Sequence, residues 1–287
     1  MPPPNPVSSP RNSHGDGAGA DPILRLRNVA LSHAQRSGEG ACATVNWEVW
    51  PGDYWLVGAL PGSGKSRLLA VAAGLEHPDQ GEVSYRGKPY TSLSADALQQ
   101  TRTRVGMVFE HGGRLFRELT IEENLLTPLR YHFGPKGGGG ADWVGTVLSK
   151  SGLERLKDRR PAGMGVAYSQ RAALARALVL RPEVLLLDNP LALLESSQAH
   201  WWIEFLNELS RGADWLDGRP LTLAITTDDL RPWRQQQSGL SLALLGPSRW
   251  EVYSSGVPWS NPEDRLMQEL LVANLQPRQS APREASA

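Results

Sequence analysis

The segment Ala59-Leu-Pro-Gly-Ser-Gly-Lys-Ser66 carries the residue types of a phosphate-binding loop. The pattern G-x-x-x-x-G-K-S/T lets backbone N–H groups face phosphates and follows them with a lysine and a hydroxyl. Lys65 would reach the β- and γ-phosphates of a nucleotide, and the Ser66 hydroxyl would ligate Mg²⁺. A helix that starts here would add positive potential for anions. The predicted nucleotide-binding residues are Leu60, Pro61, Gly62, Ser63, Gly64, Lys65, Ser66 and Arg67.

One position of this loop departs from the pattern. Ala59 replaces the first glycine, and Gly58 stands one residue early. A small side chain is tolerated there if its φ angle is negative. The flanking residues fit, because a β-type run at 54–58 precedes the loop and apolar residues at helical spacing follow over 65–75. The competing interpretation is a glycine-rich turn with an isolated lysine.

A phosphate loop that binds Mg²⁺ needs a second acidic group at the end of a neighbouring buried strand. The run Val184-Leu-Leu-Leu-Asp188 supplies one. Four apolar residues that end in an acid are a weak motif alone. Their position after an Ala- and Leu-rich helical stretch strengthens the signal, and we predict that Asp188 is a metal ligand.

The elements that would position these groups alternate between strand and helix. Residues 23–29 alternate like an edge strand, and residues 44–50 form a second strand. Two short buried strands at 184–187 and 221–226 each follow a helical stretch, which favours a mainly parallel sheet. The part between 111 and 180 is mostly helical in pattern, and its glycine-rich run from Gly134 to Gly140 is an insertion tip or a plain linker.

The composition limits the function classes. The chain has 287 residues with 30 basic and 30 acidic side chains, and this balance argues against a general binder of nucleic acid or anionic membrane. No apolar run approaches the roughly 18–20 residues that span a bilayer. The single cysteine, Cys42, excludes an internal disulfide and fits a reducing compartment. Residues 1–21 and 277–287 have the composition of disordered tails, so we place the folded domain at 22–276.

The order of these segments resembles the nucleotide-binding subunit of ATP-binding-cassette (ABC) transporters over nearly all of residues 22–272. Asp188-Asn-Pro-Leu-Ala-Leu-Leu-Glu195 is similar to the family stretch D-E-P-x-S-x-L-D, and residues 170–178 resemble the helix after the family signature. Residues 105–110 and 115–129 resemble the Q-loop and the start of the helical subdomain. The resemblance implies an α/β fold: a P-loop NTPase (RecA-like) core, an N-terminal antiparallel β-subdomain and an inserted helical subdomain at about 111–180.

Within the family, the chain most resembles the ATPase subunit of Mla/Mce-type lipid transporters. The segments that carry this similarity are residues 106–130, Arg171-Ala-Ala-Leu-Ala-Arg-Ala177 and the stretch from Asn261 to Leu270. The resemblance therefore implies lipid as the transported substrate.

The family resemblance also implies cofactors and partners. Two subunits would sandwich two ATP molecules with Mg²⁺, each site combining the phosphate loop of one chain with the signature of the other. A separate integral-membrane permease would hold the dimer at the cytoplasmic face of the inner membrane, with residues 112–128 in its docking groove, and no nucleic acid is implied. An aromatic residue would stack on the base. His33 is the nearest candidate, and a histidine in a solvent-facing loop is the competing interpretation.

Three positions at the expected γ-phosphate differ from the family. Asn189 replaces the glutamate that deprotonates the attacking water, and an amide cannot accept that proton at neutral pH. Asp228 replaces the switch histidine that contacts the γ-phosphate. Glu110 replaces the Q-loop glutamine, and a carboxylate ligates Mg²⁺ as well as an amide oxygen does. The implied metal ligands are Ser66, Asp188 and Glu110.

The change at position 228 matters most for charge. An anion about 4 Å from the γ-phosphate would cost on the order of 4 kcal/mol at an effective dielectric constant near 20. Asp228 must therefore point away from the phosphate, bind Mg²⁺, be protonated or disfavour the closed ATP state.

The signature is altered as well. Alignment on Arg171 places it at Met164, Gly165, Val166, Ala167 and Tyr168. Gly165 replaces the serine that bonds the γ-phosphate, and Val166 and Ala167 replace glycines that allow close backbone approach. The acid of the D-loop survives only as Glu195, one methylene longer.

Together these changes predict a subunit that binds ATP and Mg²⁺ but hydrolyses ATP weakly or not at all. An intact partner would not rescue it, because one composite site would contain Asn189 and Asp228 and the other this chain's signature. The alternatives are a working transporter ATPase, a non-hydrolysing regulatory or structural subunit on the same kind of permease, a soluble ABC protein of DNA repair or translation, and a non-ABC phosphate-loop kinase.

Overall fold

The computed structural model describes residues 21–31, 43–112, 114–135, 140–234, 239–253 and 264–272. The predicted tails lie outside the described residues except for Asp21, and so do His33, Cys42, residues 136–139 of the glycine-rich run and residues 261–263. None of the helices in the described ranges has both the length and the apolar character needed to span a bilayer.

A six-stranded sheet forms the centre of the molecule, in the order β10-β9-β3-β8-β7-β6. Its strands are β3 (Tyr54–Ala59), β6 (Val105–Val108), β7 (Val184–Asp188), β8 (Thr222–Thr227), β9 (Leu240–Leu245) and β10 (Trp250–Tyr253). All neighbours pair in parallel except β9 and β10. Every residue of β3, β7 and β8 is buried, as expected for strands covered on both faces. The predicted parallel sheet is confirmed.

A second, antiparallel sheet has the order β2-β1-β4-β5. It consists of β1 (Leu24–Ala30), β2 (Thr44–Val49), β4 (Gln80–Tyr85) and the short β5 (Lys88–Pro89). The prediction of an edge strand at 23–29 is wrong, since β1 pairs with β2 on one side and β4 on the other. Alternation shows only that one face of a strand is buried, here through Leu24, Leu26 and Val29, and says nothing about its backbone neighbours.

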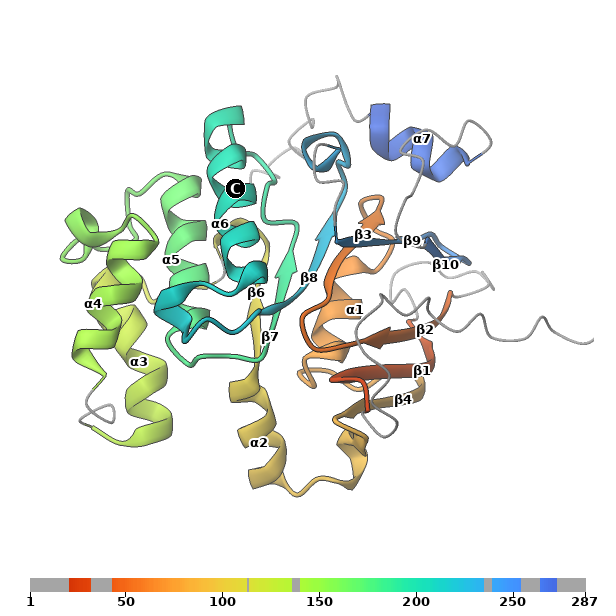
Figure 1. The fold of residues 1–287 in the computed structure, drawn as a ribbon, viewed down its shortest axis with the longest axis horizontal. Coiled ribbons are helices and arrows are strands. Elements are labelled where there is room, and N and C mark those ends of the chain that lie inside the picture. Colours follow the sequence, from red (N-terminus) through yellow and green to blue (C-terminus); the bar gives the residue numbers. More distant parts are fainter. Residues whose placement is uncertain are drawn as a thin grey trace, which may run out of the picture.

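Seven helices are described: α1 (Lys65–Ala72), α2 (Ala95–Arg104), α3 (Ile121–Phe133), α4 (Ala141–Lys150), α5 (Val166–Leu178), α6 (Ser196–Arg211) and α7 (Arg265–Val272). The part between 111 and 180 is mostly helical, as predicted, and α3 begins at a capping box made by Thr120 and Glu123. Helices α3, α4 and α5 gather on the side of the central sheet away from β1, β2 and β4 (Figure 1).

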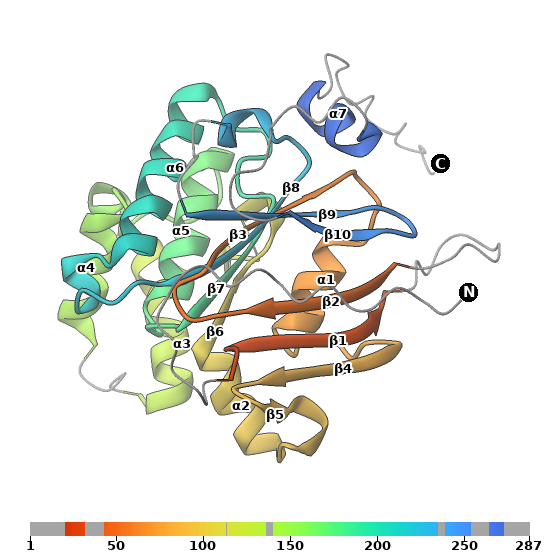
Figure 2. The ribbon, with the colours of Figure 1, turned by 45° about the vertical axis from the view of Figure 1, so that its right-hand side comes forward.

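The two sheets enclose α1. Apolar residues of α1, such as Leu68 and Val71, belong to one buried cluster with residues of β1, β2 and β3. Figure 2 shows this helix between the central and antiparallel sheets. The opposite face of the central sheet packs against α3 to α6 in a second cluster. The loop between β3 and α1 is thereby supported at both ends by packed elements.

Candidate nucleotide site

The loop between β3 and α1 has the backbone of a phosphate cradle. Gly62 and Gly64 have φ angles of 81° and 93°, in the left-handed region that favours glycine. A Cβ atom built on Gly62 would meet nothing within 4 Å, so this part of the loop opens outward. Ala59 ends β3 in an extended conformation, and its φ angle is not positive. The alanine in place of the first glycine of the pattern is therefore tolerated.

The polar groups of the loop fit a nucleoside polyphosphate. Gly64 caps α1 without any side-chain hydrogen bond, so the helix N-terminus is available to an anion. The buried Ser63 hydroxyl has no hydrogen-bond partner in the described part of the chain, as expected of a group that a ligand would satisfy. Lys65 is buried at the start of α1, and Ser66 beside it is exposed. These residues would hold ATP, with the Ser66 hydroxyl on Mg²⁺.

Asp188 lies at the carboxyl end of β7, as predicted. Its neighbour on β8 is Thr226, whose hydroxyl donates a 2.9 Å hydrogen bond to the Asp188 Oδ1 atom. The described residues contain no cluster of three or more His, Cys, Asp or Glu side chains that could hold a metal alone. Mg²⁺ commonly takes one or two carboxylates and completes its coordination shell with water and phosphate oxygens, so Asp188 and Ser66 fit such an ion.

Sequence reasoning missed Thr226. The signal was a hydroxyl residue that follows the apolar run Leu223-Ala-Ile225, directly before Thr227-Asp-Asp229. Its role follows only from the β7–β8 register.

Replacing Thr226 by valine is expected to lower the free energy of unfolding by about 1–2 kcal/mol, because it leaves the buried Asp188 carboxylate without its donor. Urea unfolding measures this change. Thr146→Val is the matched control, since it removes a hydroxyl hydrogen bond from the exposed face of α4. An equal effect of the two substitutions would contradict a structural role for Thr226.

Asn189 and Glu110 meet although they lie far apart in the sequence. The Asn189 Nδ2 atom donates a 2.7 Å hydrogen bond to the Glu110 Oε1 atom. Asn189 is only 1% exposed and has a φ of 46°, a left-handed backbone that asparagine tolerates well. The resemblance implies a glutamine at position 110 and a glutamate at position 189. This chain has a carboxylate at 110 and an amide at 189, so the two groups have exchanged places. Glu110 was predicted as a metal ligand, and here one of its oxygens is occupied by the Asn189 amide.

Asp228 faces the phosphate loop. The Asp228 Oδ2 atom lies 3.9 Å from the Lys65 Nζ atom, and the two side chains are 16% and 8% exposed. The sequence left open four arrangements for Asp228. The structure shows its carboxylate turned toward Lys65 of the phosphate loop, and not away from it.

The predicted signature segment forms the N-terminus of α5. Gly165 caps this helix with an extended backbone and offers no side-chain hydrogen bond. Val166 and Tyr168 are each 41% exposed, so the segment presents apolar surface. Arg171 lies with its guanidinium carbon 3.7 Å from the Trp201 ring centroid and donates a 2.7 Å hydrogen bond to Gln198, which ties α5 to α6. The loss of a serine hydroxyl at this position remains a prediction from the sequence resemblance.

The family model described as ABC transporter matches residues 42–192, a stretch that contains both the phosphate loop and Asp188. This chain belongs to the ABC transporter family. The methionine import ATP-binding protein MetN 1 of Acinetobacter baylyi is 31% identical over 254 residues, which cover 87% of this chain and 68% of that protein. The sulfate/thiosulfate import ATP-binding protein CysA of Synechocystis is 35% identical over 171 residues, covering 58% of this chain and 46% of the relative.

A solved structure supports the fold. A dimeric ATP-binding cassette in a post-hydrolysis state, bound to ADP and phosphate, has a TM-score of 0.67 and 27% identity, covering 80% of this chain and 98% of its own. The core fold predicted from the resemblance is confirmed. Coverage of the curated relatives is lower, and this chain spans little more than half the length of the methionine import proteins of Coxiella burnetii and Ralstonia nicotianae.

Proposed function

We propose that this protein is the nucleotide-binding subunit of an ABC transporter and that it binds ATP and Mg²⁺ with weak or lost hydrolysis. The observation that carries nucleotide binding is the formed phosphate loop, with Lys65 buried at the start of α1 and the Ser63 hydroxyl without a partner among the described residues. The observation that carries weak hydrolysis is the Asn189 side chain, which donates to Glu110 and cannot act as a base.

The partners follow from the same proposal. A separate integral-membrane permease would hold two nucleotide-binding subunits at the cytoplasmic face of the inner membrane. The dimeric cassette among the structural neighbours supports the pairing of subunits. The exposed Val166, Tyr168 and Leu193 side chains lie on the segments that a second subunit would cover.

The substrate is a finer proposal. The sequence resemblance favours lipid, while the named relatives import methionine or sulfate and thiosulfate. Mass spectrometry of lipid that co-purifies with the subunit–permease complex tests the proposal, with methionine and thiosulfate binding to the same complex as the comparison. Enriched phospholipid supports a lipid transporter. Saturable binding of methionine or thiosulfate without lipid contradicts it.

A second candidate is a non-hydrolysing regulatory or structural subunit on such a permease. The contact between Asp228 and Lys65 favours it, because an acid beside the phosphate-loop lysine reduces the positive charge available to a γ-phosphate. The two candidates share nucleotide binding and differ in turnover.

Replacing Lys65 by alanine is expected to weaken Mg²⁺-ATP binding at least tenfold, or by about 1.4 kcal/mol, since the lysine supplies the only full positive charge in the predicted loop apart from Arg67. Isothermal titration with ATP and ADP measures the change. Lys150→Ala is the matched control, because Lys150 is an exposed lysine at the end of α4. Equal affinity of both variants and the unmodified protein would contradict a nucleotide site at this loop.

A further inference from the structure

The contact between Lys65 and Asp228 joins two elements that frame the nucleotide site. Lys65 is the first residue of α1, and Asp228 is the first residue after β8, which neighbours β3 in the sheet. At 3.9 Å, with both side chains largely buried, the charges attract each other more strongly than an exposed surface pair does.

Backbone and side-chain bonds on either side of Asp228 fix its position. The Thr227 hydroxyl accepts a hydrogen bond from the Asp229 N–H and donates one to the Asp229 carbonyl. The Asp229 carboxylate is turned to the Arg231 guanidinium, with two hydrogen bonds of 2.9 and 2.7 Å. Asp229 is thus committed elsewhere, and Asp228 is the acid presented to the lysine.

Helix α7, the last helix of the described residues, contacts the segment that follows Asp228. The Leu230 N–H donates a 3.0 Å hydrogen bond to the Leu270 carbonyl at the end of α7. A Cβ atom on Gly58, directly before the phosphate loop, would lie 2.9 Å from the side chain of Leu270 and 3.4 Å from that of Leu230, so the end of β3 lies against both residues. Helix α7 therefore contacts both the residues that follow Asp228 and the end of β3 that leads into the phosphate loop.

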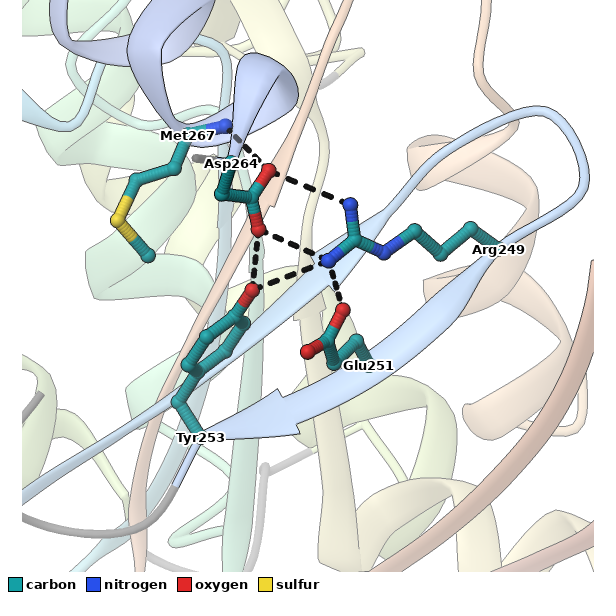
Figure 3. Close-up of polar contacts among 5 residues, drawn as sticks. All are labelled: Arg249, Glu251, Tyr253, Asp264 and Met267. Carbon is teal, nitrogen blue, oxygen red and sulfur yellow. Dashed lines mark hydrogen bonds and ion pairs between the residues drawn. The ribbon is translucent and has the colours of Figure 1, made fainter. Parts of the chain in front are cut away.

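Helix α7 is itself anchored by a buried carboxylate (Figure 3). Asp264 accepts hydrogen bonds from the Met267 N–H at 3.1 Å, from the Arg249 guanidinium at 2.9 Å and from the Tyr253 hydroxyl. Burial alone would raise the pKa of Asp264, but these donors outweigh it and hold the pKa below its ordinary value. The carboxylate is charged at neutral pH and fixes the start of α7 to β10.

We propose that the site is selective for a nucleoside diphosphate over a nucleoside triphosphate, with Asp228 as the residue that sets the selectivity. The inference rests on the proposed nucleotide site. A triphosphate brings further negative charge to the end of the phosphate chain, where Lys65 would otherwise neutralise it. Asp228 already pairs with that lysine and adds a like charge beside it. A diphosphate lacks the γ-phosphate and avoids most of this repulsion.

The opposite selectivity would follow if Asp228 ligated Mg²⁺. The carboxylate would then favour the Mg²⁺-triphosphate complex, and its removal would weaken ATP binding. The effect of one isosteric substitution on the two affinities therefore separates the two roles.

The test compares the dissociation constants of Mg²⁺-ADP and of the Mg²⁺ complex of a non-hydrolysable ATP analogue. Unmodified protein is expected to bind ADP about tenfold more tightly, and Asp228→Asn is expected to reduce that ratio about tenfold through a gain in triphosphate affinity. Asp217→Asn is the matched control, because it breaks a surface ion pair with Arg181. This arginine precedes the amino end of β7, whereas the nucleotide site lies at the carboxyl ends of the strands.

Equal affinities in the unmodified protein, an unchanged ratio in Asp228→Asn, or a loss of triphosphate affinity in that variant would each overturn the selectivity. In each of these three cases, binding of both nucleotides by the unmodified protein would leave the proposed function standing. Failure of the unmodified protein to bind either nucleotide would overturn the proposed function and the selectivity together. Asp228→His, which restores the family residue, provides a second variant and is expected to move the ratio in the same direction as Asp228→Asn.

Discussion

Placing a glutamate at position 189 is expected to destabilise the protein rather than repair its chemistry. In the Asn189→Glu variant the amide that donates to Glu110 becomes a second carboxylate at a position that is 1% exposed. Two facing carboxylates repel each other, and the buried one loses its partner. We expect the free energy of unfolding to fall by about 1–3 kcal/mol.

The exchange variant Glu110→Gln with Asn189→Glu provides the matched comparison. It restores one amide and one carboxylate at the two positions, so it is expected to recover most of the stability that the single substitution loses. Urea unfolding of the unmodified protein, the two single variants and the double variant gives the coupling free energy between the two positions. We expect it to be about 1–3 kcal/mol. Additive effects of the two substitutions would show that the contact contributes nothing.

The rate of ATP hydrolysis by Asn189→Glu is a second measurement, independent of stability. Asn189→Glu alone is expected to leave ATP hydrolysis unchanged, because Asp228 and the signature from Met164 to Tyr168 are still altered. A large gain from this single change would mean that those two features matter less than the structure indicates.

The sequence predicted the elements that hold the site, because their signals are local. The glycines and lysine of the phosphate loop lie within a few residues of one another, and so do the apolar residues before Asp188. Each strand and each helix is likewise indicated by the periodicity of its own residues. Parallel pairing then places the carboxyl ends of β3, β8 and β7 at one edge of the sheet.

The contacts within the site were not predictable in the same way. Asn189 meets Glu110 across 79 residues, and Asp228 meets Lys65 from the far end of β8. Residue types and spacing show which groups approach the site, but packing decides which of them touch. The prediction of β1 as an edge strand failed for a similar reason, since its second partner, β4, comes from beyond α1 in the sequence.

The largest effect that we expect from the altered residues is a loss of ATP hydrolysis at the γ-phosphate. A positioned general base contributes about 10²–10⁴ to the rate, and the Asn189 amide cannot take up the proton of the attacking water. The Glu110 carboxylate, which contacts Asn189, already accepts the amide hydrogen bond. In the proposed dimer, Gly165 would offer no hydroxyl to the γ-phosphate bound by the second subunit, so both composite sites would be affected.

ATP turnover by the protein purified with its permease, compared with Lys65→Ala in the same complex, tests this account most directly. The account predicts that the unmodified complex binds Mg²⁺-ATP, that the variant binds it more weakly, and that both release phosphate at the same negligible rate. A turnover of several ATP molecules per second that is lost in Lys65→Ala would contradict it, and would identify the subunit as a working ATPase.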